Sequence, residues 1–104
     1  MKPLLHPEAA SFQLPSILYA LSDPVRLEII RQLAAEGETP CGGVDLPVAK
    51  STASHHFKVL REAGVIFVRQ EGTQRCISLR RSELDDRFPG LLDAILTAEA
   101  GHQA

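Results

Sequence analysis

The chain has 104 residues, of which 44% are hydrophobic and 23% are charged, with a formal net charge of −2. This length suits one small domain, and the apolar content excludes a disordered chain. No apolar run approaches the roughly 20 residues that cross a bilayer, and no signal-peptide core follows the N-terminus, so we expect a cytoplasmic protein without membrane contact.

The charges are unevenly distributed along the chain. Residues 50–81 include seven basic and two acidic side chains, whereas the rest of the chain has four basic and eleven acidic ones. This asymmetry favours a basic surface that faces nucleic acid, opposite an acidic far side. A chance fluctuation of surface charge is the alternative.

The first third of the chain predicts an arm and two helices. Residues 1–10 have no periodicity, so we expect a flexible arm. Apolar residues at helical spacing predict a helix over 11–21, with Pro15 in its first turn and more apolar surface than one core contact needs. A second helix is expected over 24–36, because Asp23 is an N-cap type of residue.

The next segment predicts a short strand and a short helix. Residues 37–43 are rich in turn formers. Within them 39–41 are expected to form the short strand that, in winged-helix folds, pairs with the last strand of the hairpin. Residues 44–50 form a short apolar piece that ends in a turn, which is the size of the first helix of a helix-turn-helix pair.

The segment 50–64 predicts the helix around which the chain is organised. At about 100° per residue one narrow stripe is apolar or small, and we expect it to pack against the core: Ala53, Phe57, Leu60 and Gly64. Gly64 is placed as a left-handed stop after the last apolar turn. We expect the N-cap to be the hydroxyl of Ser51 or of Thr52.

The opposite side of this helix is suited to DNA. Small hydroxyl groups, an imidazole and a lysine can reach base edges and phosphates, and they form our contact set: Ser51, Thr52, Ser54, His55 and Lys58. Within it, Ser54 and His55 are candidates for base edges and Lys58 for phosphate. His56 lies at the border of the core stripe, where we expect a half-buried histidine. A solvated amphipathic helix is the alternative to a DNA-reading one.

After this helix the chain predicts a hairpin and a last helix. Two β-rich runs, 65–70 and 75–79, flank a turn over 71–74 and make a hairpin, the wing. At the tip of this wing, four residues are expected to reach the DNA backbone or the minor groove: Gly72, Thr73, Gln74 and Arg75. Ser82 is expected to cap a last helix that ends near Ala98 and that Pro89 kinks or splits, before a frayed tail over 99–104. The fold class is therefore mainly α with a small β-hairpin, a winged helix-turn-helix in one domain over 11–98.

Three stretches share a pattern with one family of regulators. They are the Ser-Asp-Pro-x-Arg motif at 22–26, the Ser-x-His-x-x-x-Leu-Arg-x-x-Gly-x-Ile motif at 54–66, and Glu-Gly at 71–72. On these residues the chain resembles the ArsR-type (arsenic-repressor-like) winged-helix transcription regulators, over roughly residues 15–98.

The resemblance implies a repressor that leaves double-stranded DNA when an effector acts on it. It also implies a homodimer formed by the first and last helices, which places two recognition helices about one DNA turn apart on an imperfect palindrome. Arg26 is the family's recurrent arginine at its position, and we expect a structural role in which it binds a neighbouring carboxylate or carbonyl.

The effector is less apparent from the residues. The resemblance implies that metal sensors carry paired cysteines before the helix-turn-helix or His and carboxylate clusters on the last helix. Here Cys41 stands alone and the last helix has no histidine before His102, so we expect no metal and no cofactor. A metal site that uses Cys41, Cys76 and a ligand from a second subunit is the alternative.

A redox switch is the sharper hypothesis for the signal. Cys76 alternates with Ile77 on its strand, and a paired strand at 39–41 would bring Cys41 close. Oxidation to a disulfide, or modification of a thiol by an electrophile, would then change the position of the hairpin. Two inert core thiols are the alternative. We expect no enzyme, because neither cysteine lies in a catalytic motif with a base. A winged helix used only for protein association is the remaining alternative.

Overall fold

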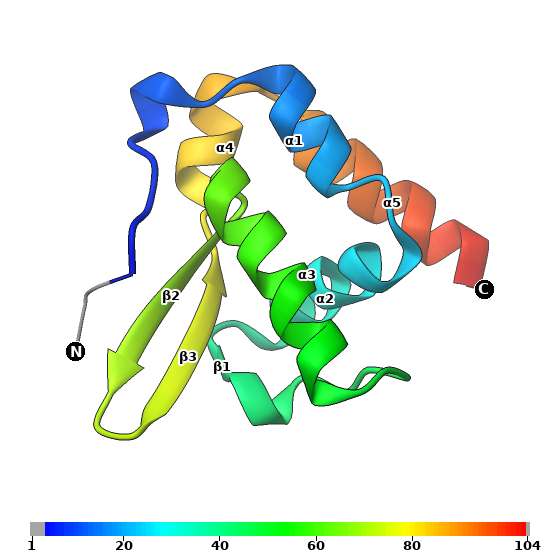
Figure 1. Ribbon diagram of the computed structural model, residues 1–104. Helices are drawn as coiled ribbons and strands as arrows, with labels where there is room; N and C mark the ends of the chain where they lie inside the picture. The colour runs from blue at the N-terminus through cyan, green and yellow to red at the C-terminus, as the bar shows by residue number, and fades with distance from the viewer. Residues whose placement is uncertain (1–3, 104) are drawn as a thin grey trace.

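The computed structural model describes residues 4–103, which form five α-helices and a three-stranded antiparallel sheet (Figure 1). The elements follow in the order α1 (Leu14–Ala20), α2 (Pro24–Glu36), β1 (Thr39–Pro40), α3 (Lys50–Ala63), β2 (Ile66–Glu71), β3 (Gln74–Leu79), α4 (Arg81–Arg87) and α5 (Leu91–Gln103). Two short 3₁₀ turns lie at Ala9–Ser11 and Cys41–Gly43. This order of helices and hairpin agrees with the sequence prediction except that the helix expected over 44–50 is absent.

The start of α2 is fixed by its cap. The Asp23 carboxylate accepts the backbone N–H groups of Val25 and Arg26 at 2.8 and 3.2 Å. Pro24 occupies the first helical position, where its missing N–H leaves no hydrogen bond unmade. These two residues confirm the boundary predicted at Asp23.

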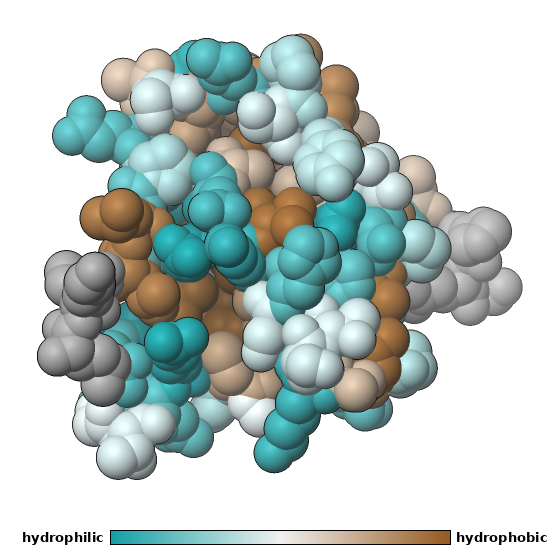
Figure 2. All heavy atoms as spheres, in the orientation of Figure 1, coloured by the Kyte–Doolittle hydropathy of each residue, from teal (hydrophilic) through white to brown (hydrophobic). Residues whose placement is uncertain are grey.

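The core lies between the helices and the sheet, with α2 and α3 packed on the strands and α1 packed on α3. Its largest fully buried side chains are Ile17, Ile29, Ile30, Leu60, Val65, Ile66 and Ile77. From α3, Leu60 lies fully inside and Gly64 is buried at its end, whereas Ala53 and Phe57 remain half-buried. The predicted core stripe is therefore buried only in its C-terminal half. Figure 2 shows apolar side chains in the hollow between α3 and the hairpin.

Gly64 is required at the end of α3 for two reasons. Its φ of +96° lies in the left-handed region, as the sequence predicts for a stop. A Cβ atom at this position would also lie 2.3 Å from Cε1 of Phe12, well inside van der Waals contact. The helix end and the packing of Phe12 therefore depend on the same missing side chain.

The sheet has the strand order β1-β3-β2. Thr39 is paired with Ile77 and Pro40 with Cys76, which confirms that the short strand pairs with the last strand of the hairpin. The hairpin closes with Gly72 and Thr73, and only Gly72 has positive φ (+60°), as a type II′ turn requires. The wing, which is the hairpin of β2 and β3, thus forms one sheet with β1, the short strand that precedes α3.

The helix expected over 44–50 is replaced by irregular chain. Within the described residues the sole regular element between β1 and α3 is the 3₁₀ turn Cys41–Gly43. Pro47 has no N–H to donate, and it disfavours helical backbone at Leu46. A seven-residue segment with a proline near its centre cannot complete two helical turns.

The C-terminal helix is split in two, one of the two outcomes expected at Pro89. α4 ends at Arg87 and α5 begins at Leu91. The expected cap at Ser82 is not formed: Leu84 N–H bonds to the carbonyl of Arg80, so the helix begins at Arg81 and Ser82 lies within its first turn. α5 continues to Gln103, beyond the end expected near Ala98, and residue 104 lies outside the described residues.

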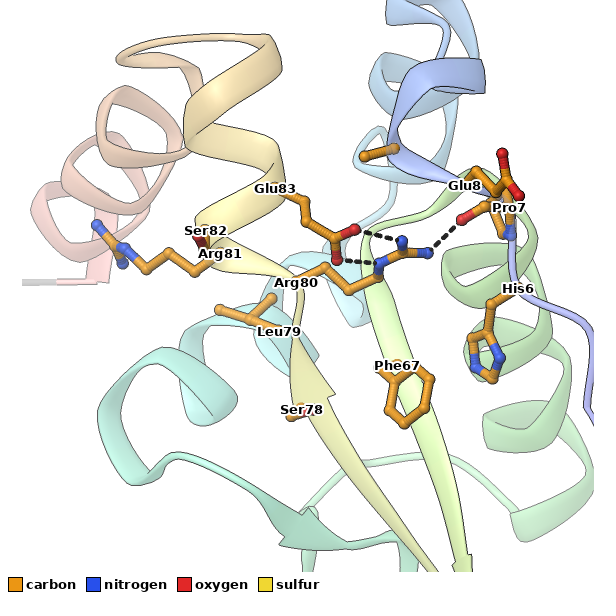
Figure 3. Close-up of a pocket in the computed structure, with 11 residues that line it drawn as sticks. His6, Pro7, Glu8, Phe67, Ser78, Leu79, Arg80, Arg81, Ser82 and Glu83 are labelled. Atoms are coloured by element: carbon orange, nitrogen blue, oxygen red, sulfur yellow. Dashed lines mark hydrogen bonds and ion pairs between the residues drawn. The ribbon is translucent and has the colours of Figure 1, made fainter.

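The N-terminal segment differs most from its expectation as a flexible arm. From Leu4 onward it runs beside β2, and Figure 3 shows its His6 beside Phe67 (ring centroids 4.4 Å apart). Nε2 of His6 accepts the Val68 N–H at 3.0 Å. Three arginines donate to backbone carbonyls of this segment: Arg61 to Leu5, Arg80 to Pro7 and Arg87 to Ala9. Residues 1–3 of the expected arm lie outside the described residues.

Candidate nucleic-acid interface

α3 presents a polar side to solvent. The five contact residues chosen from its sequence are all exposed: Ser51, Thr52, Ser54, His55 and Lys58. Their side chains offer hydroxyl, imidazole and ammonium groups on a helix slim enough for a major groove about 12 Å wide. These five residues therefore have the chemistry and the exposure that DNA contact needs.

The start of α3 differs from the prediction. The helix begins at Lys50 after an extended Ala49, and no side chain caps it. Ser51 and Thr52 already lie in the first turn, so the cap expected from one of these hydroxyls is not formed. Both hydroxyls instead belong to the exposed surface of the first turn.

The inner side of α3 is held by a buried guanidinium. Arg26, 6% exposed, donates from Nε to the carbonyl of Ala20 at 2.6 Å and lies 3.0 Å from Nδ1 of His56. His56 is 8% exposed, whereas the adjacent His55 points to solvent. The two neighbouring histidines thus have opposite surroundings, as their positions relative to the core stripe indicate.

The tip of the wing is exposed throughout. Gly72, Thr73, Gln74 and Arg75 all face solvent. The Gln70 side chain steadies the turn, because its Nε2 donates to the Gly72 carbonyl at 2.9 Å while its Oε1 accepts from Nε of Arg75 at 3.4 Å. The wing therefore carries a cation next to its turn.

The basic segment is less basic than its composition predicts. Three of its seven basic side chains pair with carboxylates: Arg69 with Glu38 and Glu71, Arg80 with Glu83, and Arg81 with Asp85 and Asp93. In the described chain, no ion pair neutralises the other four: Lys50, Lys58, Arg61 and Arg75. Lys50 and Arg61 were not in the predicted contact set, although they lie on the same helix as Lys58.

The two cysteines lie at the junction of β1 and the wing. Cys76 is paired with Pro40, the residue before Cys41, and both thiols are half-buried. Burial raises the pKa of the Cys41 thiol, Arg75 partly opposes this effect, and the neighbouring Cys76 adds to it. The topology thus brings together the two cysteines that were predicted as a redox pair.

The described residues form neither a metal-binding cluster nor a membrane-spanning helix. Among residues 4–103, no group of three or more His, Cys, Asp or Glu side chains could hold a metal ion. In the same range, no helix has the combined length and hydropathy needed to span a bilayer.

Comparison with known proteins identifies several similar chains. The family described as "Helix-turn-helix domain" matches residues 21–69. The uncharacterized HTH-type transcriptional regulator YceK of Bacillus subtilis is 43% identical over 76% of this chain and 82% of its own length. The arsenical resistance operon repressor of Staphylococcus xylosus is 32% identical over 86% of each chain.

A solved structure has a similar fold. The transcriptional repressor BigR from Xylella fastidiosa superposes with a TM-score of 0.65 at 29% identity, over 82% of this chain and 84% of that one. This similarity confirms the winged-helix fold predicted from the sequence.

Proposed function

Because this chain belongs to the ArsR-type family of helix-turn-helix transcriptional regulators, we propose that it is a dimeric repressor that places α3 in the major groove of an imperfect palindrome. The observation that carries this proposal is the exposed polar side of α3, which Arg26 anchors from behind. Beside it lies a wing with Arg75, which makes no ion pair within the described residues. We expect such a repressor to work in the cytoplasm.

The contacts divide by chemistry. Ser54 and His55 offer short donors and acceptors for base edges, so they specify the sequence. Lys58 reaches phosphate, and the wing tip from Gly72 to Arg75 reaches the backbone or the minor groove, whose negative potential suits an arginine.

The apolar surface of α1 supports a dimer. Leu14, Leu18 and Tyr19 are 41%, 46% and 65% exposed, an unusual grouping on a seven-residue helix. α5 adds half-buried Leu91, Ile95 and Leu96. Pairing of these helices between two copies would bury both surfaces and set the two recognition helices about one DNA turn, roughly 34 Å, apart.

The cysteines support release by oxidation. A hydroperoxide oxidises the Cys41 and Cys76 thiols to a disulfide and is itself reduced to an alcohol and water, the two thiol hydrogens going to these products. The new bond links the 3₁₀ turn before α3 to the strand of the wing that carries Arg75. The wing and α3 then lose the relative position that DNA binding needs.

The test is binding to DNA from upstream of the protein's own gene, at fixed salt, with reduced and mildly oxidised protein. Cys41→Ser and Cys76→Ser are matched controls, because each removes one thiol and leaves the other. Tight binding by reduced protein that oxidation abolishes only when both thiols are present supports the redox repressor. Binding that is indifferent to oxidation assigns the cysteines a structural role. Lack of specific binding in either state means that this DNA is not the operator, or it favours a winged helix used only for protein association.

A further inference from the structure

A groove lies between α3 and the wing, on the face that Figure 2 shows. Its volume is about 490 Å³, within the range of sites that bind small organic molecules. Five segments enclose it: the N-terminal segment, the 3₁₀ turn after β1, α3, β2 and β3. Its apolar side chains are Leu4, Ala53, Phe57 and Val68.

One face of α3 forms a wall of this groove. Lys50, Ala53, Phe57 and Arg61 recur at intervals of three and four residues, so they lie along one side of the helix. Ala53 and Phe57 supply its apolar centre, and a basic residue stands at each end. Phe57 is half-buried, so the core does not use its whole ring.

The rim of the groove is positive. It carries the four cations that no carboxylate neutralises in the described part of the chain: Lys50, Lys58, Arg61 and Arg75. Two of them have neutral partners, since Arg61 donates to the Leu5 carbonyl at 2.6 Å and Arg75 to Oε1 of Gln70. Cations clustered around a concave apolar surface focus a positive potential in it.

We propose that this groove binds a small organic anion with an apolar body, an aliphatic or aromatic carboxylate, and that this ligand is an effector of the protein. The carboxylate pairs with the rim and the body covers Ala53, Phe57 and Val68. Binding to DNA phosphates would account for the cations, but phosphates make no contact that would need the apolar lining of the groove.

The effector role rests on the proposed function. Lys58 and Arg75 belong both to the rim and to the proposed DNA contacts, so an anion that pairs with them competes with phosphate. Cys41 also lines the groove, so the same ligand covers one thiol of the proposed redox pair.

Binding is tested first without DNA. Calorimetry measures the affinity for 4-phenylbutyrate, with decanoate as the aliphatic counterpart and 4-phenylbutylamine as the matched cation. We expect both carboxylates to bind and the amine to bind at least about tenfold more weakly. In the Cys76→Ser variant, 4-phenylbutyrate should also slow alkylation of Cys41 by iodoacetamide.

The location is tested by a substitution that fills the apolar centre of the groove. Ala53→Leu adds bulk inside the groove and keeps every charge, so it should weaken carboxylate binding by about tenfold or more. Ala35→Leu is the matched control, because Ala35 is exposed on α2 outside the groove. Circular dichroism of both variants verifies that the helices are retained.

The outcomes separate this inference from the proposed function. Carboxylate binding that Ala53→Leu weakens and that lowers DNA affinity supports both the site and the effector role. The same binding by a protein that has no DNA affinity supports the site while the proposed function fails. The inference is overturned if the protein binds DNA but neither carboxylate binds at about 1 mM, or if the amine and the Ala53→Leu variant bind as well as their counterparts.

Discussion

Nη1 of Arg26 lies 3.0 Å from Nδ1 of His56, and this buried contact joins α2 to the centre of α3. Arginine only donates hydrogen bonds, so Nδ1 of His56 accepts, and the proton of the neutral ring is on Nε2. The same guanidinium donates to the carbonyl of Ala20 at the end of α1. One side chain therefore fixes three helices relative to one another.

Replacing Arg26 should destabilise the fold strongly. Arg26→Ala leaves Ala20 O and Nδ1 of His56 buried without a donor, and we expect a loss of about 2–3 kcal/mol of unfolding free energy in urea titrations. Arg31→Ala is the matched control. Its partner Glu28 is a helix neighbour three residues away and Arg31 is exposed to solvent, so the loss of this ion pair should change the unfolding free energy far less. Equal effects of the two substitutions would contradict the anchoring role of Arg26.

Gly64→Ala should destabilise more than Gly72→Ala. Both glycines have positive φ, so each substitution costs about 1–2 kcal/mol of backbone strain. Only the Cβ at position 64 also meets the Phe12 ring, whereas the space around Gly72 is open. Thermal unfolding of the two variants isolates the packing contribution. Similar melting temperatures would show that the Phe12 ring moves aside without cost.

Removing a phosphate-binding cation should reduce the salt dependence of DNA affinity. Lys58→Ala and Arg75→Ala should each weaken binding to specific and random DNA alike and lower the slope of log K against log salt by about one. His55→Ala should instead weaken specific binding, by about 1–3 kcal/mol for a lost base contact. Arg31→Ala, outside the interface, should change neither quantity. Unchanged affinity in all of the first three variants would favour a winged helix used only for protein association.

A charge on α1 should dissociate the dimer. Leu18→Glu places a carboxylate in the proposed interface, and we expect sedimentation velocity to show a shift from dimer to monomer. Leu5→Glu is the matched control, because Leu5 is 80% exposed but lies on the N-terminal segment, away from α1. A dimer that survives Leu18→Glu would place the interface elsewhere.

Acidification should release the N-terminal segment from β2. Burial, followed by the charges of Arg61 and Arg80, lowers the pKa of His6 below its ordinary value of 6.5. The docked state therefore favours the neutral ring. Its stabilisation is complete above pH 6.5 and decreases as the pH falls through 6.5 toward the lower folded pKa.

The Val68 amide reports this release, since its hydrogen bond to Nε2 of His6 is lost when the ring is protonated. We expect its NMR resonance to titrate as the pH falls below 6.5. In His6→Ala the titration should be absent. An amide resonance that is insensitive to pH in the unaltered protein would contradict the release of the N-terminal segment on protonation of His6.

Local signals explain why much of the fold could be predicted. The Asp23 cap and the stop at Gly64 act within a few residues, and the helix boundaries predicted from them are confirmed. The turn at Gly72 likewise predicted the hairpin, although each strand extends one residue further toward the turn than expected. The exposure of the contact residues on α3 follows from helical periodicity in the same way. At 44–50 the apolar pattern predicts a helix that does not form, because Pro47 interrupts it.

Contacts between distant residues explain what the sequence could not show. The N-terminal segment is held by Arg61, Arg80 and Arg87, which follow their acceptors by 56, 73 and 78 residues. The groove likewise combines five separate segments. Neither arrangement leaves a periodic pattern in the chain, because the residues involved are neighbours only after folding.

The position of His6 has a consequence for the behaviour of the protein at high concentration. β2 is at the margin of the sheet, where unpaired backbone groups offer a template for another strand. His6 occupies the Val68 N–H, and its ring covers Phe67 beside it. The N-terminal segment thus blocks edge-to-edge pairing of β2 between molecules. Protein without this segment should therefore aggregate at a lower concentration than the full chain.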